Sequence, residues 1–163
     1  MTRQITGARV AADLPETMTA MGFDDPGGPD VLRPETLPVP EPGENQVLIR
    51  VSHAGINRPD VIQRQGFYPP PPGASPIPGL EVAGTVVATG IGAPPEMLGR
   101  RVCALVSGGG YAEYCLAHAA HCLRVPDTMA LDVAAGIPET LFTVWHNVFE
   151  RGWARDGESL LVH

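Results

Sequence analysis

Glycine and proline interrupt the apolar stretches of this chain at short intervals, and this limits the length of any regular element. The 163 residues include 19 glycines and 18 prolines, which punctuate apolar runs. Short apolar runs separated by turn residues are typical of many short β-strands. In the stretch QVLIRVS, residues 46–52, Val47, Ile49 and Val51 recur with the period of two expected of a strand. Strands are therefore expected over 18–23, 37–39, 46–52, 81–89, 102–106 and 111–116.

The periodicity changes after about residue 127. Asp132 is a candidate cap for a short helix, and Pro138 suits the first turn of a second helix, where no N–H is needed. Apolar side chains then recur at helical spacing and are expected to pack in the core, and Gly152 is a plausible stop. A buried strand is expected over 159–163. The apolar helical positions are Leu141, Phe142, Trp145, Val148 and Phe149.

Composition excludes several classes of protein. The net charge is −7 and only 18% of residues are charged, which argues against binding to the phosphates of nucleic acid. No apolar run is long enough to span a membrane, and residues 1–17 lack the apolar core of a secretory signal and are expected to form a flexible arm. Three cysteines without a CxxC motif are typical of reduced thiols, so a cytoplasmic protein is expected.

Residues 53–81 carry the most specific pattern in the chain. Asn57 and Asp60 are followed by Gln-Arg-Gln-Gly, then by Tyr68, a run of prolines, and Gly-Leu-Glu ending at Glu81. This order resembles the zinc-free quinone oxidoreductases of the medium-chain dehydrogenase/reductase superfamily. It is most similar to the zeta-crystallin-like, tumour-suppressor-inducible branch, with its NR-x-D-x-x-QRQG-x-Y signature.

The resemblance implies a domain layout. It predicts an α+β, mainly β fold, with a GroES-like twisted, partly open barrel over residues 18–128. Residues 129–163 would hold connecting helices and the first strand of a dinucleotide-binding domain that otherwise lies outside this chain. The resemblance covers residues 18–163, about half of the family's length. The chain is therefore expected to be inactive alone, and the full-length form to be a homodimer or homotetramer.

The resemblance also implies the site. Tyr68 matches the family's active-site tyrosine, which would hydrogen-bond or protonate the oxygen of a quinone; alternatively it packs against the proline run. Asn57 and Thr143 match residues that contact the nicotinamide end of NADPH. Asn57 is also suited to an Asx-turn, and Thr143 to a bond with its own helix. Asp60 and Gln63 are further cofactor-cleft candidates, although Asp60 also suits a cap or turn.

No zinc is expected. The positions that match the catalytic zinc ligands of the superfamily hold Asn57, Leu80 and Glu139; leucine cannot ligate a metal, and an amide is a poor zinc ligand. Glu81 is then expected to make a structural hydrogen bond or ion pair.

Two other motifs were weighed. Cys115, His118, His121 and Cys122 have zinc-ligand chemistry, but steps of three residues on a strand point Cys115 and His118 to opposite faces. The glycines at 108–110 are interpreted as a structural turn, because a strand and not a helix is expected after them.

The predicted function is NADPH-dependent reduction of a quinone. One alternative keeps the scaffold and changes the substrate, as in the enoyl and alkenal reductases of the same superfamily. The other is a non-catalytic, GroES-like binding module. No nucleic-acid or membrane partner is expected.

Overall fold

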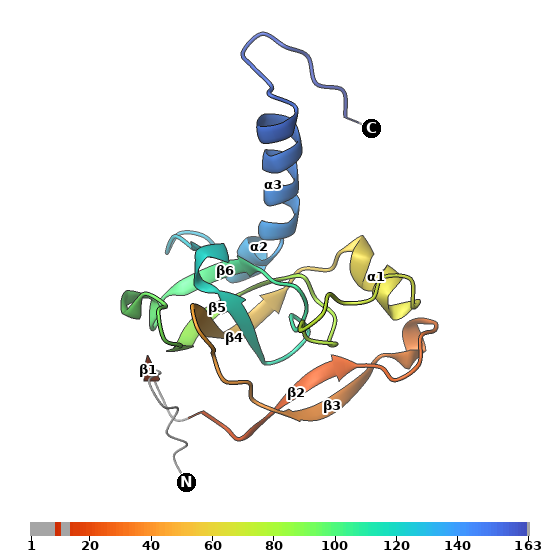
Figure 1. The fold of residues 1–163 in the computed structure, drawn as a ribbon, viewed down its shortest axis with the longest axis vertical. Helices are drawn as coiled ribbons and strands as arrows, with labels where there is room; N and C mark the ends of the chain where they lie inside the picture. Colours follow the sequence, from red (N-terminus) through yellow and green to blue (C-terminus); the bar gives the residue numbers. More distant parts are fainter. Residues whose placement is uncertain (1–8, 11–13, 163) are drawn as a thin grey trace.

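The computed structural model describes residues 9–10 and 14–162, which form a mainly β fold with two antiparallel sheets. The larger sheet has the strand order β7-β4-β5-β6-β8, and β1 also pairs with β5. A separate ribbon of β2 and β3 lies at the end far from helix α3 (Figure 1). The strands are β1 Arg9–Val10, β2 Thr17–Gly22, β3 Arg33–Pro38, β4 Gln46–Ala54, β5 Glu81–Thr89, β6 Arg101–Leu105, β7 Tyr114–His118 and β8 Cys122–Arg124.

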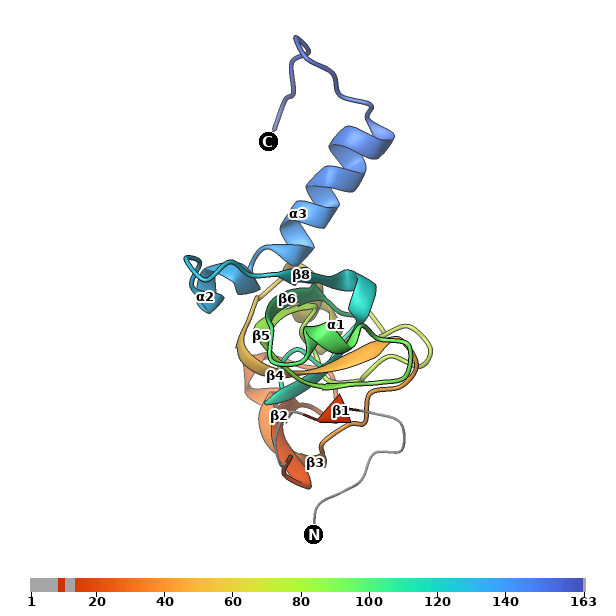
Figure 2. The same ribbon diagram turned by 90° about the vertical axis from the view of Figure 1, so that its left-hand side faces the viewer.

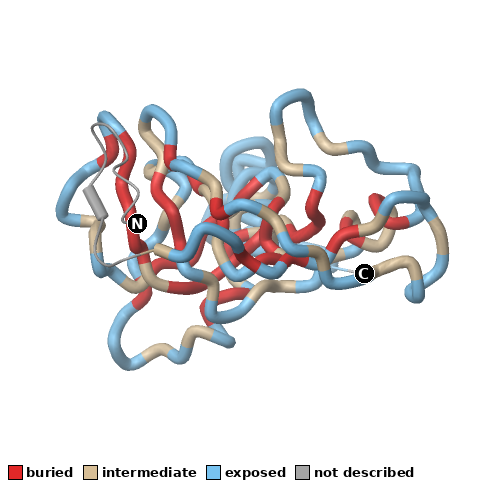
Figure 3. The backbone as a smooth tube through the Cα atoms, turned by 90° about the horizontal axis from the view of Figure 1, so that it is seen from below, coloured by how far each residue is buried: buried red, intermediate tan, exposed pale blue. Residues whose placement is uncertain are grey.

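The two longest strands, β4 and β5, form the centre of the molecule. Val47 and Ile49 of β4 pack in one buried cluster with Val82 and Val86 of β5, and Leu48 packs in a second cluster on the other side. The pairing of β4 with β5 shifts register after Leu48 and again after Val51. Such bulges bend a strand and increase its twist, which suits a curled sheet. The buried segments run through the middle of the molecule (Figure 3).

Helices are short and lie at one end of the sheet. The α-helices are α1 Arg58–Arg64, α2 Leu131–Ala135 and α3 Pro138–Val144, and α3 continues as the π-helix η4, Trp145–Arg151. Helix α2 contacts β4, β5 and β6 through Ala134 and Ala135, which are buried. By contrast, α3 and η4 project away from the sheet (Figures 1 and 2). Single 3-10 turns occur at Pro29–Val31, Pro95–Met97 and Ala119–His121.

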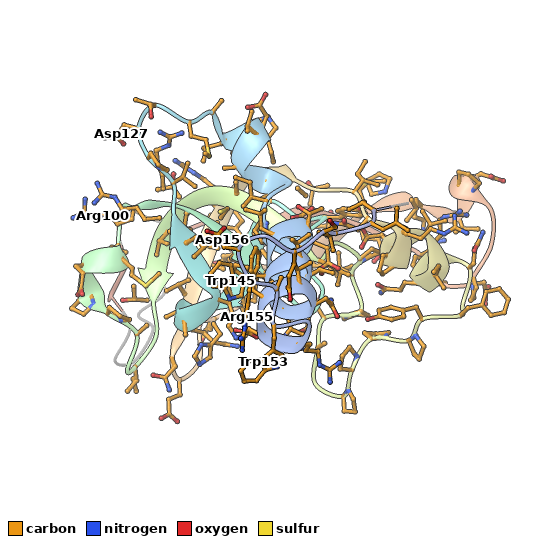
Figure 4. The ribbon with its side chains drawn as sticks, turned by 90° about the horizontal axis from the view of Figure 1, so that it is seen from above. Arg100, Asp127, Trp145, Trp153, Arg155 and Asp156 are labelled. Carbon is orange, nitrogen blue, oxygen red and sulfur yellow. The ribbon has the colours of Figure 1, made fainter. Side chains whose placement is uncertain are left out.

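The apolar stripe of this projecting helix is not core, contrary to the sequence-based prediction. Trp145 is 59% exposed and Phe149 is 48% exposed. Their rings pack on each other, with centroids 5.1 Å apart. Seen from above, Trp145 and Trp153 lie at the projecting end of the molecule (Figure 4). The periodicity identified the helix correctly, but no other described element covers its apolar face.

Most predicted elements are confirmed with small shifts. Strand β5 has the expected bounds, and the helix from Pro138 ends at Gly152 as expected. Strand β7 begins at Tyr114 and not at Tyr111, since only an isolated bridge involves Ala112. Strand β3 is longer than the strand predicted over 37–39, and β1 and β8 were not predicted.

Two local predictions near the C-terminal end were wrong. Helix α2 begins at Leu131 with Ala130 as its cap, so Asp132 lies inside the first turn, where its side chain accepts a bond from Val133 N–H. The strand expected over 159–163 is not formed in its described part, and Leu161 is 80% exposed. A strand needs a neighbour to pair its backbone groups, and none lies beside this segment in the described chain.

The expected arm, residues 1–17, is described only at 9–10 and 14–17. Arg9 and Val10 pair with Thr89 and Ala88 of β5. No helix in the described part of the chain has both the length and the apolar character that a membrane span requires.

Candidate functional site

The candidate site is built around the start of helix α1. Asn57 precedes the helix in an extended conformation, and Pro59 lies in its first turn. The carboxylate of Asp60, in that same turn, accepts a hydrogen bond from the backbone N–H of Asn57, with Oδ2 at 2.8 Å. This hydrogen bond stabilises the start of the helix and fixes the loop that carries Asn57.

Asp60 also joins two distant segments to this loop. It is buried, and its Oδ1 accepts a bond from Gly79 N–H at 3.0 Å. Its Oδ2 accepts a second bond from the hydroxyl of Tyr111 at 2.9 Å. Burial, followed by the bond to Asp60, raises the pKa of Tyr111. Tyr111 therefore stays a neutral donor, and Asp60 holds three chain segments together.

Glu81 is the second buried carboxylate, and it connects α1 to α3. It is 2% exposed, and its Oε1 accepts a bond from the Nδ2 of Asn57 at 2.9 Å. Its Oε2 accepts a bond from the backbone N–H of Glu139 at 2.9 Å. Burial, then the nearby carboxylates of Glu81 and Asp60, raise the pKa of Glu139. Glu81 thus makes structural hydrogen bonds, as expected from the sequence.

Glycines at positions 55 and 79 allow neighbouring segments of the chain to pack closely around this site. A Cβ at Gly55 would lie 2.1 Å from Oε1 of Glu81. Gly79 has a φ of +103°, and a Cβ there would lie 2.7 Å from the backbone of Gly110 and of Tyr111. The glycine turn at 108–110 thus packs directly against the segment that leads into β5, which supports its structural interpretation.

The C-terminal half of α1 holds the neighbouring loops. Gln63 is buried and donates from Nε2 to the carbonyl of Pro76 at 3.0 Å. Arg64 donates to the carbonyl of Gly27. Both side chains therefore act on backbone groups of loops that surround the helix.

The structure brings only some of the predicted residues together. Asn57 and Asp60 belong to one hydrogen-bonded cluster, with Gln63 on the same short helix. Tyr68 is 44% exposed in the loop after α1, and Thr143 is exposed on α3. In the described residues, no hydrogen bond joins either side chain to the cluster. The carbonyl of Thr143 accepts a bond from Asn147 Nδ2 at 2.8 Å.

Sequence reasoning missed Tyr111 as a member of the site. It was placed in a strand, yet its hydroxyl bonds Asp60, 51 residues earlier in the chain. Backbone bonds from the loop at 110–111 to Pro78 and Gly79 bring Tyr111 to this site, so no local pattern could have identified the contact. The role of the Glu139 backbone was missed for the same reason.

The four residues of the alternative metal motif, Cys115, His118, His121 and Cys122, are not grouped as a metal site. Cys115 is buried in the core and His118 is exposed, as three-residue steps along a strand predict. Burial raises the pKa of both Cys115 and Cys122 to about 12, which keeps them as thiols. Among the described residues, no three His, Cys, Asp or Glu side chains are grouped as a metal site.

Comparison with known proteins agrees with this architecture. The alcohol dehydrogenase GroES-like domain family matches residues 43–127. Quinone oxidoreductase from Lama guanicoe is 36% identical over 148 residues, which is 90% of this chain and 45% of that protein. The chain thus spans about half the length of the curated relatives it matches.

Solved structures give the same result. The human synaptic vesicle membrane protein VAT-1 homolog-like protein matches with a TM-score of 0.79 and 32% identity, over 86% of this chain and 46% of that chain. Mycobacterial Rv1454c complexed with NADPH matches with a TM-score of 0.76 and 33% identity, over 86% and 44%. The fold and the glycine-rich, hydrogen-bonded site thus define a GroES-like domain of the medium-chain dehydrogenase/reductase class. The chain belongs to the alcohol dehydrogenase GroES-like domain family.

Proposed function

We propose that this chain provides the catalytic domain of a zinc-free, NADPH-dependent oxidoreductase that reduces quinones. The observation that carries the proposal is the loop of Asn57, which Asp60 and Glu81 hold against the start of α3. This ordered polar corner occurs in a domain whose curated relatives include quinone oxidoreductases. A fixed amide beside an exposed helix suits the positioning of a planar, uncharged ring.

The predicted residues keep distinct roles in this proposal. Tyr68, which is exposed, donates its hydroxyl proton toward the quinone oxygen that gains electron density. Asn57 and Thr143 contact the nicotinamide end of the cofactor. Asp60 and Gln63 complete the cofactor cleft, Asp60 by fixing Asn57 and Gln63 by fixing the proline-rich loop.

The residues present fit only one end of NADPH. Three carboxylates, those of Asp60, Glu81 and Glu139, lie around Asn57, and no ion pair with Lys or Arg involves them in the described chain. A negative corner disfavours phosphates and suits the uncharged nicotinamide and ribose hydroxyls. When bound, NADPH would supply a hydride and be oxidised to NADP⁺, and this hydride together with one proton would reduce a quinone to a hydroquinone.

The proposal includes no zinc. Both oxygens of Glu81 already accept bonds, from Asn57 and from Glu139 N–H, and the preceding residue, Leu80, offers no ligand atom. We also propose the layout stated from the sequence, with an arm over 1–17, the GroES-like domain over 18–128 and a connection over 129–163. The full-length protein would be a cytoplasmic homodimer or homotetramer.

The test is an assay of the polypeptide that the complete reading frame encodes. Consumption of NADPH should depend on duroquinone and persist in EDTA, whereas the 163-residue chain alone should show little or no turnover. Tyr68→Phe should lower kcat by about 100-fold, because it removes the proton donor. Tyr114→Phe is the matched control and should leave kcat unchanged.

Three results would contradict this proposal. Unchanged turnover in Tyr68→Phe would remove Tyr68 from the mechanism. A preference for crotonaldehyde over duroquinone would favour the enoyl or alkenal reductase alternative. Loss of activity in EDTA, restored by zinc, would overturn the zinc-free assignment.

A further inference from the structure

A cavity of about 620 Å³ lies on a different part of the domain from the Asn57–Glu81 cluster. Its walls come from the β2–β3 ribbon, the proline-rich loop at 71–76, the end of β6 and the whole of β7. None of the predicted site residues on α1, α3 or the loop at Tyr68 lines it. Its volume is within the range of small-molecule binding pockets, about 300–1,000 Å³.

The lining of this cavity is apolar and carries no formal charge. Leu37, Leu105, Leu116 and several prolines are among the residues that line it. Among the described residues that line it, none is Asp, Glu, Lys or Arg. Burying an ion without a partner is costly, so the cavity selects against charged ligands.

The polar groups in the lining are biased toward donating hydrogen bonds. Oε1 of Gln46 accepts from Gly43 N–H at 2.9 Å, and Oγ of Ser75 accepts from Ile77 N–H at 3.2 Å. Each side chain therefore keeps a hydrogen to donate, the amide N–H of Gln46 and the hydroxyl hydrogen of Ser75.

His118, at the end of β7, also keeps a hydrogen-bond donor. Nδ1 of His118 accepts from Ala120 N–H at 3.2 Å, so this nitrogen carries no proton and the neutral ring carries its proton on Nε2. The ring of His121 lies beside it, with centroids 5.2 Å apart, and also lines the cavity. The side chains of Gln46, Ser75 and His118 thus each keep a donor.

We propose that this cavity is a second binding site, which takes a neutral, largely apolar ring compound carrying a carbonyl oxygen. The apolar walls bury the rings, and the carbonyl accepts from His118, Ser75 or Gln46. The site is distinct from the Asn57–Glu81 cluster, none of whose members lines it, although Pro76 in its wall also accepts the bond from Gln63.

Benzophenone is a suitable probe, because it has two apolar rings and one carbonyl and labels nearby residues covalently under ultraviolet light. Binding to the 163-residue chain would be measured by saturation-transfer NMR, and the labelled peptides identified by mass spectrometry. Labels are expected on the loop at 71–77, on β7 or on Met18, which line the cavity. Labels confined to the exposed helix at 141–153, or no binding, would overturn the proposal.

Two comparisons sharpen the test. Diphenylmethane has the same rings without the carbonyl and should bind about three- to tenfold more weakly, the value of one lost hydrogen bond. Ala74→Phe places a ring in the cavity and should weaken benzophenone binding at least about tenfold. Ala130→Phe, at an exposed position outside the lining, is the control and should change it less than about twofold, with melting curves checking that both variants fold. Equal binding of diphenylmethane, or of benzophenone to Ala74→Phe, would overturn the proposal.

Discussion

Single buried carboxylates organise the candidate site at the residue scale. Glu81 and Asp60 each accept bonds from groups that lie far apart in the chain, and neither forms an ion pair in the described residues. A carboxylate only accepts hydrogen bonds, so it can satisfy two donors that meet in one place. The geometry of the Asn57 loop therefore depends on the chemical type of these two residues.

Glu81→Gln should destabilise the domain by about 2 kcal/mol. Glutamine has a single acceptor oxygen, so one of the two donors, Asn57 Nδ2 or Glu139 N–H, would face an NH₂ group. Urea unfolding of the variant and the wild type measures the effect. Glu44→Gln, an exposed control, should change the free energy of unfolding by less than about 0.5 kcal/mol. Equal stability of Glu81→Gln and the wild type would show that the two bonds contribute nothing.

Gly79→Ala should cost more than about 3 kcal/mol. The positive φ of Gly79 alone disfavours alanine by about 1–2 kcal/mol, and the added Cβ would overlap the backbone of Gly110 and Tyr111. Gly73→Ala is a matched control, because Gly73 also has a positive φ but nothing lies within 4 Å of its Cβ position. Urea unfolding should show only the backbone cost in that variant. Similar losses in both variants would rule out the crowding at Gly79.

At the scale of elements, the chain combines a well-buried sheet with a helix that lacks cover. Strand β5 is buried over almost its whole length and β4 over residues 47–49, while the helix from Pro138 to Arg151 leaves Leu141, Trp145 and Phe149 about half exposed. A contiguous exposed apolar surface favours association. The sheet therefore holds the buried core, and the helix presents an uncovered apolar surface.

The exposed helix should make the isolated chain self-associate. The double variant Trp145→Gln, Phe149→Gln removes the paired rings and should weaken association by about tenfold, with the melting temperature nearly unchanged. Sedimentation velocity over a range of concentrations measures this. Ile91→Gln, at an exposed apolar position away from the helix, should leave association unchanged. A wild-type chain that stays monomeric at every concentration would contradict the prediction.

At the scale of the whole molecule, the buried thiol of Cys115 and the half-buried thiol of Cys122 connect stability to pH. Burial raises the pKa of Cys115 and of Cys122 to about 12, whereas an unfolded thiol has a pKa of about 8.5. Between these values the unfolded chain loses protons that the folded chain keeps. Stability is therefore complete below about pH 8.5 and falls as the pH rises toward 12.

The pH dependence gives a direct test. The free energy of unfolding should fall between pH 8 and 10, by up to about 1.4 kcal/mol per pH unit for each thiol. Urea unfolding in the presence of a reductant measures the slope. The double variant Cys115→Ala, Cys122→Ala should have a shallower slope, whatever its stability at pH 7. Parallel slopes would show that these thiols ionise alike in both states.

Local patterns in the sequence determined the elements of this protein. Alternation predicted β4 from residue 46, and Pro138 predicted the start of α3, because strand pleating and helix starts depend on residues only a few positions apart. The QRQG-x-Y pattern also indicated the family.

Only the tertiary structure decided which distant groups meet. Bonds between loops bring Tyr111 to Asp60, and the path of the chain brings Asn57 and the Glu139 backbone to Glu81, across separations of 51, 24 and 58 residues. Periodicity showed that the helix after Pro138 has an apolar face, but exposure depends on which other elements lie against that face. Long-range pairing and burial are properties of the whole arrangement, so no short stretch of sequence contains them.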